Sequence, residues 1–414
     1  MRSTMNMGKL LSIFGLIVLV LAALSACSQS SSPGGTQGNQ GPIKIGLSVS
    51  LSGDFSSDGK YLKQGYELWA ATVNKNGGLL GRQVQLDILN DNSDPKQATT
   101  DYQKLISIDH VDLVVGPFGF EALPAARVAA RNGYAFIEGA GSTPDMFQQS
   151  LNNIFSVSLS TQNSLASFAL YVLSLPPIER PKSVAYVTAD DTFARPPVDV
   201  AKKLLDAGGI TSTMYKTYPD ETTDFTPIAK QVAQSGAEVV IMGNLGIPDC
   251  SAFIQTFKQQ HFSPKALIAA AGPDQGGDFI KAIGMPSTEG IFVPNGGWWP
   301  AIKTYQNDQF VHDYVAKYGG TPDAISSDTV QAYATGQVLE QAVNKIHSIN
   351  NAALMQELRK DTFNSLQGPV RFQADGQNSA AVAYLFQWQK GQLIPVYPSN
   401  QAAANPLFPK PAWP

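Results

Sequence analysis

The chain has 414 residues, of which 43% are hydrophobic and 15% are charged, and its formal net charge at pH 7 is −4. This composition is typical of a globular protein, and the length suits two folded domains better than one. The mildly acidic balance argues against nucleic acid as a partner.

The N-terminal segment has the parts of a bacterial export signal. Residues 1–9 carry two basic residues and no acid, residues 10–24 are almost wholly apolar, and Leu24-Ser25-Ala26-Cys27 resembles a lipobox. The alternatives are an ordinary export signal with a chance cysteine, or a single membrane span. The apolar run is shorter than the ~20 residues that cross a bilayer, which disfavours a span.

We therefore predict a signal peptide over residues 1–26 and lipidation of Cys27. Residues 27–41 then hold the lipidated cysteine and a flexible linker, because Ser, Gly, Gln and Asn dominate them. The mature protein would be extracytoplasmic and lipid-anchored to a bacterial cell membrane. Cys250 would be the remaining cysteine, so we expect no intrachain disulfide.

Short apolar runs alternate with stretches of helical spacing in the rest of the chain. The predicted strands are Ile43–Val49, Val84–Leu89, Val111–Val115, Ala135–Ile137, Ser183–Val187, Val239–Met242 and Ala266–Ala270. The predicted helices are Lys60–Asn74, Asp94–Ile108, Ala122–Arg131, Leu165–Leu175, Val198–Ala207, Phe225–Gln234 and Cys250–Gln260. This alternation indicates βαβ units and parallel sheets covered on both faces. Breaks near Ser156–Asn163 and Pro294–Trp299 indicate two α/β domains.

Motifs of catalysis and of cofactor or metal binding are absent from the sequence. It has no G-x-S-x-G, no H-E-x-x-H and no P-loop, and its four histidines lack ligand spacing. Cys250 stands at a predicted helix start, where its thiol pKa could be lowered, but without a nearby histidine we interpret it as a packing residue. We expect neither an enzyme nor a cofactor nor a metal site.

Several segments stand in the order and spacing of a known family. They are Ser48–Gly65, Asn74–Gly81, Asp91–Ala98, Val111–Pro117, Asp224–Pro227, Gly272–Asp274, Glu289-Gly290 and Leu366–Phe372 with Phe386–Trp388. Together they resemble type I periplasmic binding proteins, in the branch that includes leucine/isoleucine/valine-binding proteins. The resemblance covers Ile43 to Tyr397. It implies an α/β fold of two Rossmann-like lobes with parallel sheets, joined by three hinge crossings, with the ligand held between them.

The resemblance also implies domain boundaries. The N-terminal lobe is expected over residues 42–157 plus 296–367, and the C-terminal lobe over 158–295 plus 368–400. Residues 401–414 are expected to form a tail. The crossings are expected at Ser156–Asn163, Pro294–Trp299 and Gln367–Arg371.

The ligand contacts implied by the resemblance lie in loops that follow strands. In the first lobe, the segment Ala140-Gly141-Ser142 would face the polar head of an amino acid, through the backbone of Ala140 and the hydroxyl of Ser142. In the second lobe, Asp274 matches the acid that pairs with the ammonium group. Phe193 takes the place of an aromatic side chain after a second-lobe strand. A cap for a helix beginning near Gly277 is the alternative role of Asp274.

Other positions depart from the pattern of the family. Phe118, Phe120 and Glu121 replace the small hydroxyl residues of relatives, and Asp58 stands where relatives often have Tyr. Arg195 either supplies positive charge to the cleft or is a solvated loop arginine. Of the adjacent Trp298 and Trp299, we assign Trp298 to the cleft, although core packing is favoured for at least one of them. Together these residues would form an aromatic-walled, acidic cleft that suits an amine-bearing or aromatic ligand.

The resemblance implies a binding protein that delivers a small molecule to the permease subunits of an ABC importer. The default ligand is a branched-chain or related amino acid, and an aromatic, amide or amine compound is the alternative. We expect a monomer. A sensory module of the same fold is disfavoured, because no signalling segment follows before Pro414. An exported α/β enzyme is the remaining alternative, since spatial triads can be hidden in a sequence.

Overall fold

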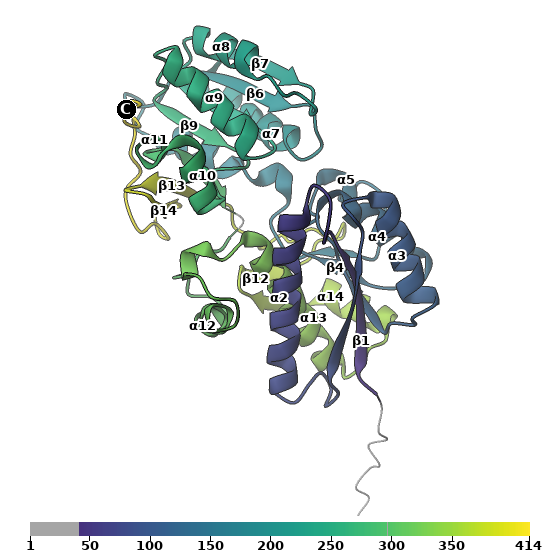
Figure 1. Cartoon of the computed structure of the whole chain (residues 1–414). Coiled ribbons are helices and arrows are strands. Elements are labelled where there is room, and N and C mark those ends of the chain that lie inside the picture. The colour runs from purple at the N-terminus through teal and green to yellow at the C-terminus, as the bar shows by residue number, and fades with distance from the viewer. Residues whose placement is uncertain (1–40, 296) are drawn as a thin grey trace, which may run out of the picture. The chain divides into compact units, whose positions relative to one another are not determined.

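The first lobe is built on a five-stranded parallel sheet, seen in the lower part of Figure 1. A computed structural model describes residues 41–295 and 297–414. The strands, in spatial order, are β2 (Val84–Asn90), β1 (Ile43–Val49), β3 (Leu113–Val115), β4 (Phe136–Glu138) and β5 (Ile154–Ser156). All pairs are parallel. Their carboxyl ends therefore share one edge of the sheet.

Helices cover both faces of this sheet because neighbouring strand residues point to opposite sides. Leu113 and Val115 pack with the helices α2 and α13, whereas Val114 packs with α3 and α4. The helices of this lobe are α2 (Ser56–Lys75), α3 (Pro95–Ser107), α4 (Ala122–Arg131), α5 (Pro144–Phe147), α12 (Asn307–Tyr318), α13 (Ser327–Ile346) and α14 (Asn351–Lys360). The short 3-10 helices η1 (Gly119–Glu121) and η3 (Pro322–Ala324) complete it.

Two glycines allow α2 and α13 to pack closely. A Cβ atom at Gly336 of α13 would lie 2.2 Å from the ring of Trp69 on α2. A Cβ atom at Gly65 of α2 would lie 2.2 Å from the carbonyl oxygen of Thr329 on α13. Helix α13 comes from the second half of the chain, so this packing joins the two sequence segments of the lobe.

The second lobe has a seven-stranded mixed sheet. Its order is β14 (Gln392–Tyr397), β13 (Tyr384–Gln389), β10 (Phe292–Asn295), β9 (Ala266–Ala269), β8 (Val239–Gly243), β6 (Ser183–Ala189) and β7 (Thr211–Tyr218). The strands from β10 to β7 are parallel, and β13 and β14 are antiparallel. The helices are α6 (Ala166–Ser174), α7 (Arg195–Ala207), α8 (Thr226–Gln234), α9 (Ile247–Gln259), α10 (Gly276–Ile283) and α11 (Met285–Thr288). The short η2 (Thr161–Asn163) precedes α6.

The chain passes between the two cores three times. The first two passages follow β5 and β10, at the predicted breaks. The third follows the hairpin of β11 (Thr362–Ser365) and β12 (Gly368–Arg371). This hairpin packs on the first core, since Val370 and Phe372 are buried there and the Phe372 ring lies 5.3 Å from that of Phe155. The third passage thus lies between Phe372 and Tyr384, after the segment Gln367–Arg371, because apolar side chains hold β12 to the first lobe.

The last residues of the chain pack along the second lobe. Gln387 on β13 accepts the N–H of Leu407 at 2.7 Å and donates to its carbonyl oxygen at 2.9 Å. The N–H of Lys410 donates to the carbonyl oxygen of Lys265, and the indole N–H of Trp413 donates to that of Phe262.

Each strand and helix predicted from Ile43 to Ala270 is found in its place, but β5, β7 and the short α5 were not predicted. The largest difference in a boundary is the start of α2, which begins at Ser56 rather than Lys60. Helix α7 begins at Arg195 rather than Val198, because Pro196 and Pro197 fit its first turn. Cys27 lies outside the described residues. Among those described, no helix is both long and apolar enough to cross a membrane.

Candidate ligand-binding site

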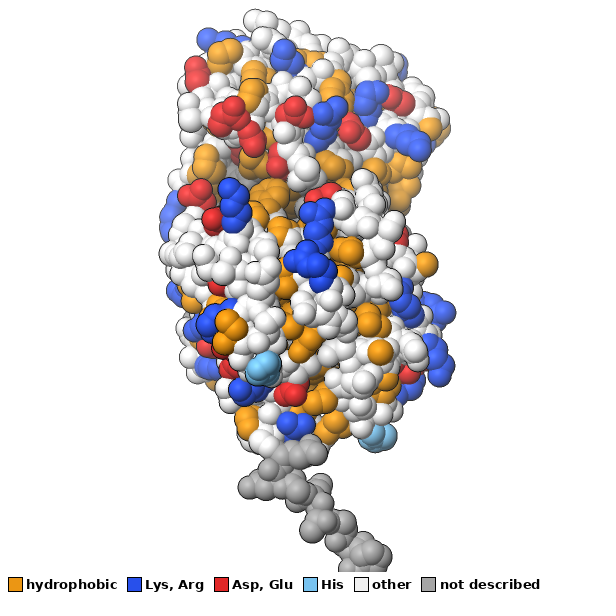
Figure 2. Space-filling view, turned by 90° about the vertical axis from the view of Figure 1, so that its right-hand side faces the viewer, with side chains coloured by type: hydrophobic (Ala, Val, Ile, Leu, Met, Phe, Trp, Pro, Cys, Tyr) orange, Lys and Arg blue, Asp and Glu red, His pale blue; other side chains and the backbone are white. Residues whose placement is uncertain are grey.

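The candidate site lies where the carboxyl ends of both sets of parallel strands meet. In the first lobe, the loops after β1, β3 and β4 end at this edge, and in the second lobe the loops after β6, β8 and β9 do. Loops at this edge of an open parallel sheet are the usual ligand sites of such folds. On the face drawn in Figure 2, hydrophobic side chains gather at the level where the two lobes meet.

Three phenylalanine rings form an aromatic wall on the first lobe. Phe118 and Phe120 follow β3, and both contact Phe55, which precedes α2, at ring distances of 5.4 and 6.1 Å. Phe120 is 39% exposed and Phe118 is half-buried. The aromatic wall (Phe55, Phe118 and Phe120) therefore offers ring faces to a ligand with an apolar or aromatic body.

Three carboxyl groups, the cleft acids Asp58, Asp274 and Asp328, influence one another across the site. Burial raises the pKa of Asp328 to about 8, and the charges of Asp58 and Asp274 add to the effect. Burial likewise raises the pKa of Asp274, with a contribution from Asp58, and that of Asp58 itself. The side chain of Asp274 is nevertheless exposed to solvent.

The cleft acids stand at the starts of three helices. Asp58 is in the first turn of α2, Asp328 is in the first turn of α13, and Asp274 shortly precedes α10. Acids are favoured there by the helix dipole, which gives them a structural role as well. Asp274 is not the cap of α10, because the N-cap residue is Gln275 and no side chain caps that helix.

Glu121 is completely buried beneath the aromatic wall. Neither of its carboxylate oxygens has a hydrogen-bond partner in the described part of the chain. Burial raises the pKa of Glu121 to about 7, and the charges of Asp91 and Asp94 add to this. The side chain is thus turned into the first lobe, and a direct contact of Glu121 with a ligand stays a prediction.

The ligand loop, residues 139–143 after β4, uses its polar groups within the protein. The N–H of Gly141 donates to Glu138 Oε2 at 2.6 Å, and the hydroxyl of Ser142 donates to the carbonyl oxygen of Leu159 at 3.1 Å. The carbonyl oxygen of Ala140 accepts the N–H of Gly119 at 3.1 Å. Ala140 is half-buried, and Gly141 and Ser142 are buried. These polar groups are therefore already engaged within the protein.

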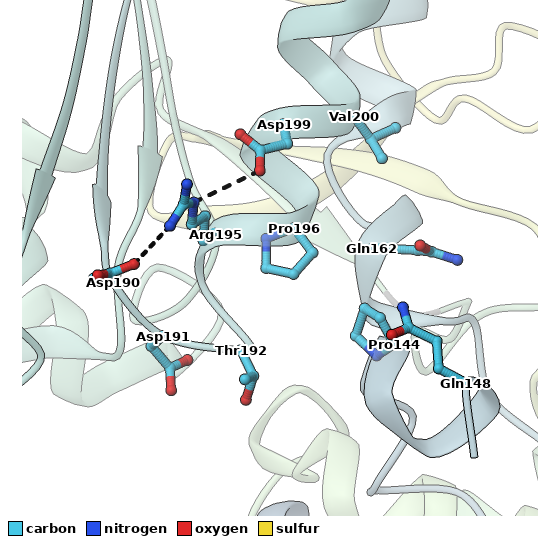
Figure 3. A pocket seen from close by; sticks show the side chains of 10 residues that line it. All are labelled: Pro144, Gln148, Gln162, Asp190, Asp191, Thr192, Arg195, Pro196, Asp199 and Val200. Carbon is cyan, nitrogen blue, oxygen red and sulfur yellow. Dashed lines mark hydrogen bonds and ion pairs between the residues drawn. The ribbon is translucent and has the colours of Figure 1, made fainter.

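The second lobe contributes Phe193 and Arg195 after β6. Phe193 is half-buried and packs on the second core. Arg195 is exposed and pairs with Asp190 at 2.8 Å and with Asp199 at 3.8 Å. It lines an open groove of about 520 Å³, which Gln162 of the first crossing also lines (Figure 3). Two acids thus offset the charge of Arg195, and its role toward a ligand stays a prediction.

The two adjacent tryptophans pack on different lobes. Trp298 is 8% exposed, and its indole N–H donates to Asn307 Oδ1 at 2.6 Å within the first core. Trp299 contacts the rings of Tyr384 and Phe386 on β13 at 5.1 and 5.5 Å. Trp298, which we assigned to the cleft, therefore lies in the core, because its ring and its N–H both have partners there.

Phe55, Glu138 and Asp328 were not among the predicted site residues. Phe55 and Glu138 nevertheless follow the predicted strands Ile43–Val49 and Ala135–Ile137, in loops of the kind where ligand contacts were expected. The sequence near Asp328 indicates only a helix start, because Ser326, two residues earlier, is a residue type that caps helices. In the structure the Ser326 hydroxyl caps α13. No sequence pattern relates Asp328 to Asp58, since their proximity depends on the packing of α13 against α2.

Comparison with known proteins identifies the family. The sequence profile described as "Periplasmic binding protein" matches residues 42–392, most of the chain. The chain belongs to this family of solute-binding proteins. Two relatives are Leu/Ile/Val-binding protein homolog 7 of Brucella melitensis and homolog 8 of Brucella abortus. Each is 24% identical to this chain; the first match covers 95% of this chain and 99% of the relative, and the second covers 89% and 93%.

Solved structures confirm the predicted fold. A protein from Silicibacter pomeroyi aligns with a TM-score of 0.79 at 16% identity, covering 89% of this chain and 99% of that one. A Desulfitobacterium hafniense substrate-binding protein in complex with Leu aligns with a TM-score of 0.70 at 20% identity, covering 86% and 100%. A solute-binding protein from R. palustris, in complex with benzoate, aligns with a TM-score of 0.70 at 20% identity, covering 90% of this chain and 98% of that one. These likenesses establish the type I two-lobed α/β fold.

Proposed function

We propose that this periplasmic binding protein is a lipoprotein that captures a small molecule between its lobes and delivers it to the permease of an ABC importer. Family membership and the names of the relatives support transport, and the lipobox-like segment ending at Cys27 supports the anchor. Membership of the family also implies that the protein is extracytoplasmic. Solved neighbours hold ligands as different as Leu and benzoate, so the ligand is argued from this chain's own residues.

The ligand we propose carries an amine and an apolar body. The observation that carries this is the convergence of the cleft acids, whose charges act on one another across the site. A positively charged group placed among them would relieve this repulsion and would favour the ionised carboxylates. The aromatic wall would bury the apolar body.

An organic cation suits this arrangement better than a metal ion. Within residues 41–295 and 297–414, no three side chains of His, Cys, Asp or Glu are grouped closely enough to hold a metal. A carboxylate on the ligand is also poorly provided for, because the N–H of Gly141 and the hydroxyl of Ser142 are already bonded. Branched-chain and aromatic amino acids stay in the proposal, held mainly through their ammonium group.

A matched ligand series tests this proposal. Leucine, 3-methylbutylamine and 4-methylpentanoate share one side chain and differ in the head group, as do phenylalanine, 2-phenylethylamine and 3-phenylpropionate. We expect the amines to raise the melting temperature most, since a ligand that binds only the folded state stabilises it. A shift caused by the two acids alone would refute an amine-binding cleft.

Lobe closure is the second part of the proposed mechanism. A cation bound between carboxyl groups of both lobes would draw the lobes together, as in hinge closure of other two-lobed binding proteins. Small-angle scattering should then show a smaller radius of gyration at saturating ligand. Equal radii with and without a bound ligand would contradict closure.

A further inference from the structure

Glu138 occupies a confined place beneath the ligand loop. It ends β4, and its side chain is completely buried. A Cβ atom at Gly116 would lie 2.3 Å from the Cβ of Glu138, so the neighbouring loop after β3 must have glycine there. On the other side, the N–H of Gly141 donates to Glu138 Oε2 at 2.6 Å. The carboxyl group is thus enclosed by two loops of the proposed cleft.

The other oxygen of this carboxyl group faces the first interlobe crossing. Glu138 and Ser156 are register partners in the pair β4–β5, and the crossing begins directly after Ser156. Glu138 Oε1 and Ser156 Oγ are both buried, and neither has a hydrogen-bond partner among the described residues. The ligand loop meets the same crossing a second time through the bond from Ser142 to Leu159.

We infer that Glu138 is a positioning residue that fixes the ligand loop to the start of the first interlobe crossing. One carboxyl group accepts the backbone N–H of the loop and faces the hydroxyl group of the crossing strand. A hinge movement at Ser156 would therefore be transmitted to Gly141 through the register pairing of Glu138 with Ser156 and the hydrogen bond of Glu138 to the Gly141 N–H. The inference rests on the proposed function only in assuming that residues 139–143 face the ligand.

The protonation state of Glu138 should control this link. Burial raises its pKa to about 7, against smaller opposing effects of Ser156 and of the Gly141 N–H. The titratable group that faces it is the Tyr66 hydroxyl of α2, which donates to the carbonyl oxygen of Gly116. No basic side chain is recorded as its partner in the described ranges. Ionisation would leave a buried charge with one N–H donor, which is costly.

The other elements that pack against the ligand loop present only uncharged groups to it. Helix α4 presents Ala122 to the loop, at 2.2 Å from a Cβ placed on Gly141. Helix α13 presents the carbonyl oxygen of Gln331 and the hydroxyl of Thr335 to Gly139. None of these groups can neutralise an ionised Glu138. We therefore expect the ligand loop to open to water as pH rises through about 7, which would hydrate the carboxylate.

Hydrogen exchange of the full-length, ligand-free protein tests the inference. Exchange in a peptide that covers 139–143 is measured by mass spectrometry between about pH 5.5 and about 8.5, relative to intrinsic rates. In the wild type, protection of this peptide should fall as pH rises through about 7. In Glu138→Gln, which keeps an acceptor but cannot ionise, protection should not depend on pH. Glu179→Gln, a change at an exposed acid, is the matched control and should keep the wild-type profile.

A second variant keeps the test decisive if Glu138→Gln does not fold. Ser156→Ala removes the hydroxyl that lowers the pKa of Glu138, so the midpoint of the exchange profile should move to higher pH. A flat wild-type profile, or an unmoved midpoint in Ser156→Ala, would overturn the inference. No ligand is needed, so failure here is separate from failure of the amine series, which would overturn the proposed function instead.

Discussion

Asp58 and Asp274 belong to different lobes, yet their carboxyl groups act on each other. Burial raises the pKa of Asp274, and the negative charge of Asp58 raises it further. Two like charges that approach on closure would oppose it, unless a positive group lies between them. The ligand's ammonium would thus act as the bridge that makes the closed state favourable.

Asp274→Asn should weaken binding of an amine strongly. The amide keeps the shape of the side chain but removes its charge, and leaving a buried ammonium unpaired costs ~2–5 kcal/mol. Affinity should therefore fall by more than tenfold, which corresponds to ~1.4 kcal/mol. Calorimetric titration with the tightest amine of the matched series measures this. Asp278→Asn, an exposed acid in the first turn of α10 that pairs with Lys281, is the control. If the affinity of Asp274→Asn stays within about threefold of the wild-type affinity, Asp274 has a structural role and does not pair with the ligand.

Asp328 should release a proton when an amine binds. Its pKa in the free protein is raised to about 8, so the carboxyl group is mostly neutral at pH 7. A bound cation favours the ionised form and expels the proton. Titrations at pH 7 in phosphate and in Tris should give different apparent enthalpies, because the buffers differ in the heat of taking up that proton. Asp328→Asn should abolish most of the difference and weaken binding. Equal enthalpies in both buffers for the wild type would argue against this role.

Gly336→Ala should destabilise the first lobe. The new Cβ atom would lie 2.2 Å from the ring of Trp69, and overpacking of this kind costs ~1–3 kcal/mol. Without a clash, alanine in a helix is more stable than glycine by ~1 kcal/mol. A loss of stability in Gly336→Ala would therefore indicate the clash with Trp69. Gly277→Ala in α10, where no atom lies within 4 Å of the new Cβ, is the control and should be neutral or stabilising. Urea unfolding compares them; equal midpoints for both variants would refute the close packing of α2 and α13.

Glu121 should make the protein less stable at neutral than at acidic pH. Its pKa is raised from the model-compound value of 4.5 to about 7 on folding. Between these values the folded state holds more protons, so stability falls as pH rises through this range and then levels off. The contribution is up to ~3 kcal/mol. Glu121→Gln should reduce the fall in melting temperature between about pH 5 and about pH 8, whereas the exposed Glu179→Gln should not. An unchanged slope in Glu121→Gln would contradict the buried, neutral form.

Cys27→Ala should release the protein from the membrane fraction. Stable anchoring requires more than one acyl chain, and lipobox processing would attach them to this cysteine. Fractionation of cells that produce the wild type or the variant measures the effect, with Ser28→Ala as the neighbouring control. If the variant stays in the membrane fraction, the anchor must lie elsewhere.

Several of the parallel strands could be predicted because burial on both faces leaves a continuous apolar run in them, whereas the edge strand β7, which is polar and partly exposed, was not predicted. Val239–Met242 and Ala266–Ala270 are examples of such runs, and β8 and β9 begin at these same residues. Strand β12 was assigned to the other lobe, whereas the structure packs it on the first lobe, where Phe372 contacts Phe155, more than two hundred residues earlier in the chain. A local pattern carries no information about such a partner.

The sequence by itself determined the α/β class, the two-domain arrangement and the loops that border the cleft, since these follow from local periodicity and from the order of family motifs. Only the tertiary structure decided which side chains of those loops are buried and which partners they have. Trp298 turned into the core, Glu121 became buried, and Asp328 joined Asp58 and Asp274. The reason is physical: the direction of a side chain and the pKa of an acid depend on packing between segments far apart in the chain, which no local pattern encodes.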